Sequence, residues 1–317
     1  MDLSDTFATA RTVGEDALTE LEERIRGSLI ANLRRSVGIE EEPPPPCDDP
    51  ELAYVDPRSV VRIVHSDLAV MLIGGLSSLL LQSLHPSAMA GVAQHSRYRE
   101  DPLGRLERTA KFVGTTSFRS KQEASDAIAR VRRIHARVTG ETPEHTPYRA
   151  QDPELLRWVH IAEVRSFLAA FDRFGSVNLS PAERDSYVAD MAPVAIDLGA
   201  SVVPTTTDSL DLAIDRFRPE LHLTEEAKDV RTFVLRGVRR LPHEVAAYSL
   251  LVAAAVGILP PWARRQLRLP TLPLVDRLAV GPAASVFSAA TRWVVPPMTK
   301  PTGDQVVSVR PPSTVTT

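Results

Sequence analysis

The chain has 317 residues, of which 43% are hydrophobic and 24% charged, and its formal net charge is −3 at pH 7. This balance is typical of a packed soluble protein and argues against a disordered chain or a protein whose main partner is nucleic acid. The single cysteine, Cys47, excludes an intramolecular disulfide framework and a cysteine-rich zinc site.

The N-terminal stretch is acidic and amphipathic, and residues 18–37 have apolar side chains at helical spacing. It lacks the basic start and apolar run of a secretory signal, so we expect a cytoplasmic protein. The prolines within 41–50 cannot continue a helix and predict a linker, or a strap laid over the surface. Residues 1–50 are therefore expected to form an N-terminal helix and a proline-rich linker.

The most apolar early run, Leu68–Leu81, is shorter than the ~20 residues that a membrane-spanning helix needs and contains glycine and serine. A buried core helix is the better interpretation. The helical pattern starts at Asp56–Pro57 and either continues through this run or breaks at Gly74–Gly75. Pro86 biases His85 away from helical geometry and predicts a boundary there.

Asp–Pro and Ser–Pro pairs predict further helix starts at Asp101, Asp152 and Ser180. Ser120 and Glu123 have the spacing of a capping box at the start of a helix that extends to Val138. Residues 114–117 are predicted to form a turn and 141–150 a loop. Several more helical patterns follow, and no segment combines period-two strands with hairpin turns. We predict an all-α protein with one large helical domain over 51–295 and a flexible tail over 296–317.

Familiar catalytic signatures are absent from the sequence, including G-x-S-x-G, H-E-x-x-H, a phosphate-binding loop and a G-x-G-x-x-G fingerprint. Histidines and arginines instead recur among small and apolar residues in 82–95, 105–109 and 132–160. Such a pattern suits a haem, which needs an imidazole for its iron, cations for its propionates and an apolar pocket.

Three segments occur in order: LLLQSLHPSAMAGVAQHSRYREDPLGRLERTAKFV (79–113), RRIHARVTG (132–140) and PYRAQDPELLRWVH (147–160). Together they resemble the family of MpaB-type oxygenases and the catalytic domain of rubber oxygenases, or latex-clearing proteins. The resemblance spans about 59–174 and extends more faintly to about 268. It implies a largely helical fold, b-type haem, the use of O₂ and, in characterised members, oxidative cleavage of isoprenoid chains.

The family's Arg-x-x-His motif falls on Arg132 and His135, which implies that His135 is the iron ligand and Arg132 a cofactor-binding residue. The alternative for His135 is a helix histidine hydrogen-bonded to a carbonyl. His160, in WVH, is expected beside the cofactor or on its propionate side rather than as a second iron ligand.

In rubber oxygenases an Arg-x-x-Lys-Thr segment lines the distal side, and the corresponding residues here are Arg105, Arg108 and Thr109. Arg108 replaces the lysine, and an arginine can hydrogen-bond dioxygen or a propionate but cannot ligate iron as a neutral amine could. The family's acidic base has no counterpart in residues 68–99, which contain no Asp or Glu. His85 and His95 are the possible substitutes. Each has a structural alternative, His85 as a cap before Pro86 and His95 in ordering the next loop.

These observations predict a haem b-dependent oxygenase-like protein that activates O₂ on an apolar, isoprenoid or other lipid-like molecule. Its partners would be O₂, that substrate and an electron donor that the sequence does not identify; nucleic acid is not expected. Contact with a membrane surface is possible but not predicted. The alternative is a helical protein that binds haem or an apolar ligand without turnover, such as a sensor or carrier. A third interpretation is a helical membrane-surface protein held by the Leu68–Leu81 run.

Overall fold

The computed structural model of the protein describes residues 27, 44–96, 100–236 and 242–298. The helix predicted over 18–37 and nearly all of the predicted tail lie outside these ranges. The described residues form the helices and the one small sheet that follow: α2 (Val60–His65), α3 (Leu68–Gln82), α4 (Pro86–His95), α5 (Pro102–Phe118), α6 (Lys121–His135), β1 (Thr139–Glu141), β2 (Pro147–Arg149), α7 (Pro153–Phe174), α8 (Pro181–Leu198), α9 (Thr207–Phe217), η1 (Arg218–Glu220), α10 (Glu225–Arg236), α11 (Pro242–Ile258), α12 (Pro261–Gln266), α13 (Pro273–Val275), η2 (Asp276–Val280) and α14 (Gly281–Val294). The all-α prediction is confirmed.

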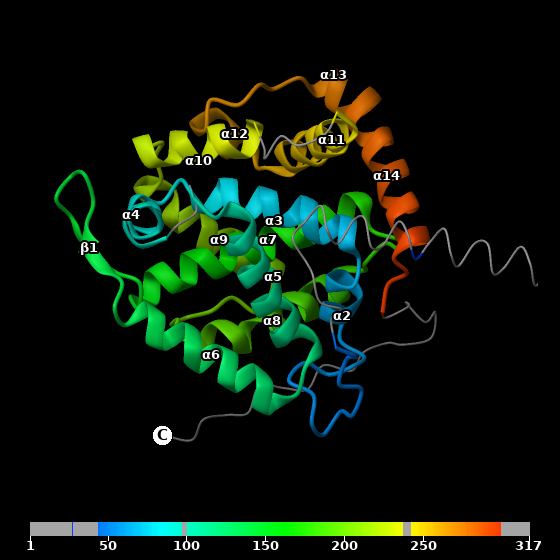
Figure 1. The fold of residues 1–317 in the computed structure, drawn as a ribbon, viewed down its shortest axis with the longest axis horizontal. Coiled ribbons are helices and arrows are strands. Elements are labelled where there is room, and N and C mark those ends of the chain that lie inside the picture. The colour runs from blue at the N-terminus through cyan, green and yellow to red at the C-terminus, as the bar shows by residue number, and fades with distance from the viewer. Residues whose placement is uncertain (1–26, 28–43, 97–99, 237–241, 299–317) are drawn as a thin grey trace, which may run out of the picture.

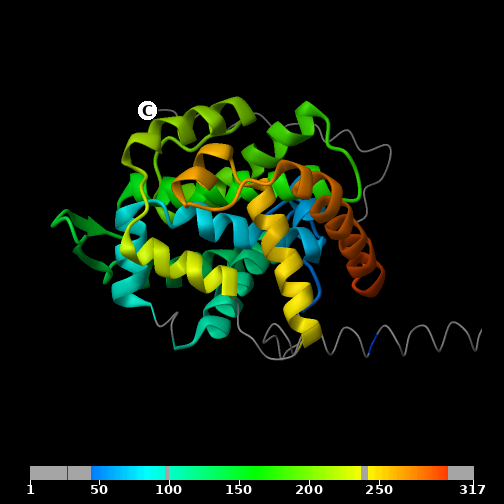
Figure 2. The same ribbon diagram turned by 90° about the horizontal axis from the view of Figure 1, so that it is seen from above.

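Helices α3 and α7 run through the centre of the molecule, with α10 to α13 above them, α14 along the right-hand side, and α5, α6 and α8 below (Figure 1). Figure 2 shows α10 and α11 in front of α3 in the view from above. Small residues let the two central helices approach closely, because a Cβ atom at Gly74 would lie 2.5 Å from Cδ1 of Phe167. The core around this crossing includes fully buried Ile73, Leu80 and Trp158.

Four predicted helix starts have the expected local hydrogen bonds. The Ser120 and Ser180 side chains accept from the backbone N–H three residues on, and both form capping boxes with a glutamate. Asp101 and Asp152 cap α5 and α7, each followed by a proline at the first helical position. Local polar chemistry therefore sets where these helices begin.

Three predicted boundaries in α2, α3 and α5 are wrong. The first helix, predicted to start at Asp56–Pro57, begins at Val60, and Ser59 is its N-cap. The chain breaks at Ser66 and Asp67, where Asp67 caps α3, and the Gly74–Gly75 pair lies inside that helix. The turn predicted over 114–117 is helical, since α5 runs on to Phe118. The hydroxyl of Ser117 donates to Val113 O at 2.7 Å, so the polar side chain is satisfied within the helix.

A β-hairpin replaces most of the loop predicted over 141–150. Strands β1 and β2 are antiparallel, with Gly140 opposite Tyr148. Helix α6 ends at His135 instead of Val138, so the hairpin starts close to the end of that helix. Buried Tyr148 holds the hairpin against α4, because its hydroxyl donates to Gln94 Oε1 at 2.7 Å.

The proline-rich segment forms the predicted strap, and it crosses the bend between α5 and α6. Cys47 N–H donates to Phe118 O at 2.8 Å, and Lys121 N–H donates to Leu52 O at 2.7 Å. The buried Arg62 guanidinium donates to Cys47 O at 2.7 Å. The strap and α2 thus fix the point from which α5 and α6 diverge.

Among the described helices, none by itself is long and apolar enough to cross a membrane; only α3 and α4 together meet that test, and they are bent by 105° to one another.

Candidate functional site

A hollow of about 380 Å³ lies at the C-terminal end of α6, beside the end of α4. Its volume is within the ~300–1,000 Å³ typical of small-molecule sites. The residues that line it are His95, Arg130, Arg133, Ile134, Arg137 and Val138. The structure thus brings His95, predicted from the sequence as a site residue, to the last turn of the helix that carries His135.

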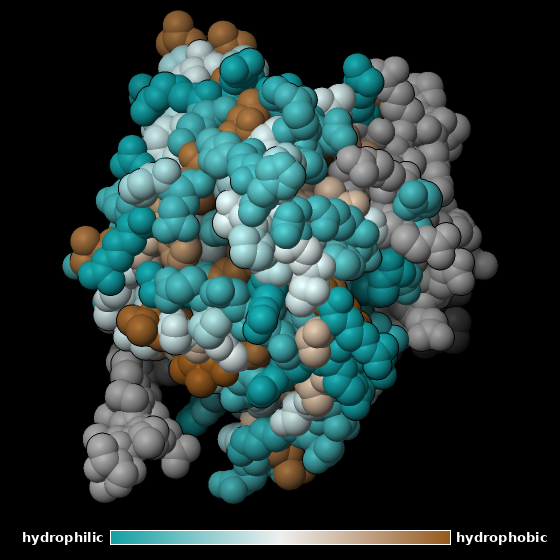
Figure 3. Space-filling view, turned by 90° about the vertical axis from the view of Figure 1, so that its left-hand side faces the viewer, coloured by the Kyte–Doolittle hydropathy of each residue, from teal (hydrophilic) through white to brown (hydrophobic). Residues whose placement is uncertain are grey.

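Three arginines give this hollow a positive charge. Arg130, Arg133 and Arg137 are spaced by three and four residues, and none has a carboxylate partner among the described residues. Ile134, whose side chain is 56% exposed, adds an apolar surface. Figure 3 faces the hairpin end of the molecule and shows a mostly hydrophilic surface with separate hydrophobic patches. Arginines beside an apolar surface suit a ligand with an apolar body and carboxylate groups.

His135 is the last residue of α6 and is half-buried. Burial lowers the pKa of its imidazole, so the ring is neutral at pH 7. No hydrogen bond to the ring is found within the described part of the chain, which leaves the carbonyl-bonded alternative without support there. A neutral imidazole with a nitrogen lone pair is the form that binds metals.

Arg132 shares α6 with His135 but contacts other elements. Its Nη1 donates to Asp197 O at the end of α8 at 3.1 Å, and its carbonyl accepts from Gln151 Nε2 at 3.2 Å. It is not among the residues that line the hollow. In this structure Arg132 joins the end of α6 to α8 and to the start of α7.

The three predicted distal residues on α5 differ in their surroundings. Arg105 is half-buried and its Nη1 donates to Ser96 Oγ at 2.7 Å, at the end of α4. Arg108 is exposed and pairs with Asp101 at 3.2 Å, and the Thr109 hydroxyl donates to Arg105 O at 3.1 Å. Of these three residues, only Arg105 has a side-chain hydrogen bond to another predicted site segment, the end of α4.

The end of α4 connects the predicted distal and proximal residues. Ser96 is bonded to Arg105, and neighbouring His95 lines the hollow beside Ile134. Nε2 of His95 also lies 3.1 Å from Thr139 O in β1. The structure thus groups Arg105, His95 and the end of α6.

His85 lies at the opposite end of α4 from His95 and does not line this hollow. It occupies the N-cap position, but its side chain makes no capping hydrogen bond. The ring is buried among aromatic residues, with centroids 6.2 Å from both Trp158 and Phe217. Burial lowers its pKa to about 4. The predicted role of His85 as a proton acceptor near the site therefore gains no support from its position.

His160 and Glu163 lie one turn apart on α7. Burial lowers the pKa of His160 to about 4 and raises that of Glu163 to about 7. Glu163 is only partly exposed, and it lies among the buried residues of α7. A carboxyl group with a pKa near neutrality can accept and return a proton at physiological pH.

A buried polar chain lies beside Glu163. Nδ1 of His65 is 2.7 Å from Ser117 Oγ, and its Nε2 is 3.1 Å from the hydroxyl of Tyr187. The Glu163 charge contributes to raising the pKa of Tyr187, which places the two groups near each other. Sequence reasoning assigned no role to Glu163 or His65. Two features of the sequence could have pointed to these residues. Glu163 lies on the apolar side of α7, and His65 lies at the end of a valine-rich helix.

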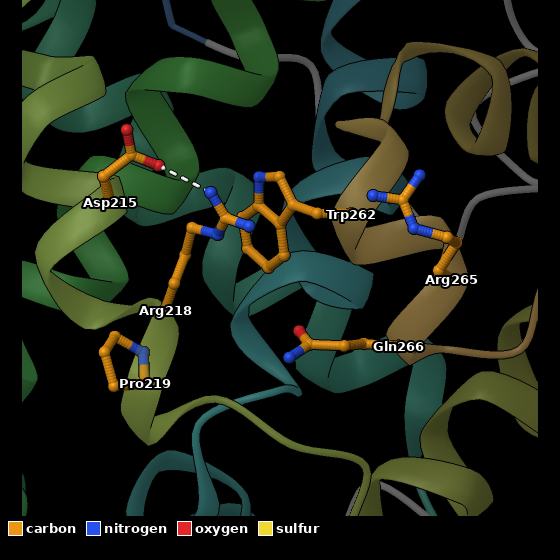
Figure 4. A pocket seen from close by; sticks show the side chains of 6 residues that line it. All are labelled: Asp215, Arg218, Pro219, Trp262, Arg265 and Gln266. Carbon is orange, nitrogen blue, oxygen red and sulfur yellow. Dashed lines mark hydrogen bonds and ion pairs between the residues drawn. The ribbon is translucent and has the colours of Figure 1, made fainter.

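A second hollow, of about 530 Å³, opens between η1 and α12 (Figure 4). Arg218 pairs with Asp215 at 3.2 Å, and its guanidinium lies 5.4 Å from the ring centroid of Trp262. None of the site residues predicted from the sequence lines this hollow. It is therefore not a candidate for the catalytic site.

Comparison with protein families gives one match, which covers residues 62–295 and therefore α2 through α14. The matching model describes the ER-bound oxygenase MpaB/B′ and rubber oxygenase catalytic domain. The chain belongs to this family of oxygenase catalytic domains, as its motifs indicated. Comparisons with curated proteins and with solved structures gave no match.

Proposed function

We propose that the protein is a haem b-dependent oxygenase that activates O₂ on an apolar, isoprenoid or other lipid-like molecule. Membership of an oxygenase family supports the reaction class. The observation that carries the proposal is His135, a half-buried imidazole whose pKa burial lowers and which has no hydrogen-bond partner in the described chain. It ends the helix whose last turns also line a cationic hollow, although His135 itself is not among the lining residues.

The residues at the end of α6 fit a haem. His135 would hold the iron, from a different face of α6 than the one that lines the hollow. On the hollow's face Arg130, Arg133 and Arg137 are cations suited to carboxylate groups, and Ile134 and Val138 add apolar surface. The described residues contain no group of three or more His, Cys, Asp or Glu side chains that could hold a metal ion. A single-histidine site therefore suits a metal that arrives within a cofactor better than one held by side chains alone.

When bound, the haem would supply the activation of O₂. Arg105, held by Ser96, is a cationic donor able to stabilise negative charge on the distal side. Glu163 does not line the hollow, but its pKa of about 7 leaves it substantially ionised above neutral pH. It is therefore the acidic group that would take a proton from a substrate reaching the interior beside α7. The low pKa of His160 keeps that imidazole neutral and limits its role to hydrogen bonding or packing.

The test is the absorption spectrum of the purified protein, with and without dithionite, after expression with ample haem. We expect a Soret band that is lost or shifted in His135→Ala. His145→Ala is the matched control, because His145 is 89% exposed in the hairpin turn and should leave the spectrum unchanged. A protein that purifies without haem under these conditions refutes the proposal.

A second candidate is a haem or apolar-ligand carrier without turnover. It is favoured by the absence of acidic residues from 68–99 and by the pairing of Arg108 with Asp101, away from the hollow. O₂ consumption with squalene as a probe separates the two functions. Consumption that depends on squalene and falls in Glu163→Gln supports the oxygenase; a haem that is reduced but consumes no O₂ with any apolar probe supports the carrier.

A further inference from the structure

The C-terminal helical segment exposes an unusual number of large hydrophobic side chains. Leu274, Leu278 and Val286 are 73%, 71% and 70% exposed, and Trp293 is 47% exposed. We call these four residues the C-terminal apolar face. Leu272, Val275 and Met298, in the same segment, are also about half-exposed. Single exposed hydrophobic residues are common, but a series within one segment marks an interaction surface.

Helix geometry places these side chains on the outer side of the segment. Val286 and Trp293 are seven residues apart and share one face of α14, whereas Ala284, Ser288 and Thr291 on the opposite face are buried. Leu274 in α13 and Leu278 in η2 are four residues apart, so they also share one face of the helical segment. Figure 1 shows α13 and α14 at the margin of the fold, where one side is free of other described helices.

The charges around this face are positive. Residues 260–298 contain five arginines and one aspartate, within a chain whose net charge is −3. The aspartate, Asp276, is already paired with Arg264 at 2.9 Å. Arg277 lies next to Leu278 in η2, is exposed and has no carboxylate partner among the described residues. Arg265 and Arg268 are exposed and equally unpaired there, but they lie in and just after α12, and Arg265 lines the hollow of Figure 4. The segment therefore offers apolar side chains together with unneutralised cations.

We propose that the C-terminal apolar face docks on an anionic lipid surface. Leucine and valine side chains enter the boundary of the acyl region, tryptophan prefers the interface, and arginines attract anionic headgroups. A second copy of the chain fits less well. In a two-fold dimer the same surfaces meet, so the arginines would approach each other without acidic partners in this segment. The docking goes beyond the proposed oxygenase function and does not depend on haem.

The test is flotation of the full-length protein with vesicles of phosphatidylcholine alone or of phosphatidylcholine with phosphatidylglycerol. We expect binding to the anionic vesicles that weakens on the order of tenfold in Leu278→Gln/Val286→Gln, since this change removes apolar surface without altering charge. The control is Ile196→Gln/Leu212→Gln, at residues that are 57% and 62% exposed on α8 and α9. Circular dichroism checks that both variants fold.

Arg277→Gln should reduce binding to anionic vesicles and leave binding to neutral vesicles unchanged. Trp293 should give a blue-shifted fluorescence on anionic vesicles, measured as the difference between the parent and Trp293→Phe, which keeps both buried Trp158 and partly exposed Trp262. The proposal is overturned if the protein binds neither kind of vesicle, or if the Leu278→Gln/Val286→Gln variant binds as well as the parent. A concentration-dependent dimer that this variant abolishes would overturn it in favour of self-association.

Discussion

Arg292 near the end of α14 donates to Asp67, the N-cap residue of α3, at 2.7 Å. The same guanidinium nitrogen donates to Phe174 O, at the end of α7, at 2.9 Å. One side chain therefore joins the last described helix to an end of each of the two central helices. Asp67 is only 2% exposed, and Arg292 is its ion-pair partner.

Replacing Arg292 by alanine should lower the free energy of unfolding by about 3 kcal/mol, because it leaves a buried carboxylate without its counter-charge. Urea unfolding followed by circular dichroism measures the change. Arg277→Ala, at an exposed position on the same segment, should change the value by less than about 0.5 kcal/mol. Equal effects of the two substitutions would contradict a special role for the Arg292–Asp67 pair.

The adjacent glycines of α3 should respond in opposite ways to alanine. Gly74→Ala places a Cβ 2.5 Å from Phe167 Cδ1 and 3.0 Å from its Cα, so α3 and α7 must separate. We expect a loss of stability of about 1–3 kcal/mol. A Cβ at Gly75 meets nothing within 4 Å, and Gly75→Ala should stabilise the protein by about 0.5–1 kcal/mol through helix propensity. Thermal or urea unfolding of the two variants in parallel decides the matter.

Buried His85 should make the protein less stable in acid. Its folded-state pKa of about 4 lies below the unfolded value of about 6.5. Above pH 6.5 both states are neutral and the group has no effect. As the pH falls from 6.5 to 4 the unfolded chain takes up the proton first, so stability falls by about 1.4 kcal/mol per pH unit. His85→Gln should reduce the slope between pH 6 and 5 by that amount, measured by urea unfolding of the variant and the parent at both pH values. Equal slopes for the two proteins would contradict the prediction.

Glu163 should have the opposite effect, because burial raises its pKa from 4.5 to about 7. Its contribution to stability is fully present below pH 4.5 and is lost as the pH rises through 7. Glu163→Gln should therefore be more stable than the parent at pH 8, by up to about 3 kcal/mol, and the difference should shrink toward pH 5. Unfolding midpoints at pH 5 and pH 8 test this without any assumption about activity; no change in the difference between them would show that Glu163 is ionised throughout.

Helix starts were predictable from the sequence because their causes are local. Ser120 and Ser180 bond to groups three residues away, and no distant contact is needed. Helix continuation through Gly114 was not predictable. A glycine costs about 1 kcal/mol in a helix, and the packing of buried Val113 and Ser117 on either side compensates for it. The hairpin was not predicted because a distant contact stabilises it: the hydroxyl of buried Tyr148 donates to Gln94 on α4.

The candidate site was also only partly predictable, because some of its features are local in the sequence and others depend on contacts with distant helices. The spacing of Arg132 and His135 is visible in the sequence, but the contact of Arg132 with Asp197 comes from a distant helix. Arg133 belongs to a charge run of a kind that usually faces solvent. The pKa of Glu163 depends on the burial that surrounding helices produce. Iron ligation by His135, the roles of the other site residues and a cytoplasmic location stay predictions.

The position of His135 at the very end of α6 bears on the entropy of ligand binding. The last turn of a helix lacks part of its hydrogen bonding and tends to fray. Here the hairpin that follows is held to α4, because Gln94 Nε2 donates to Glu141 O at 2.8 Å and accepts from Tyr148 through its Oε1. Much of the ordering of this turn is therefore complete before a ligand arrives. Gln94, which touches neither His135 nor the hollow's arginines through a described bond, would thus influence affinity by preorganisation.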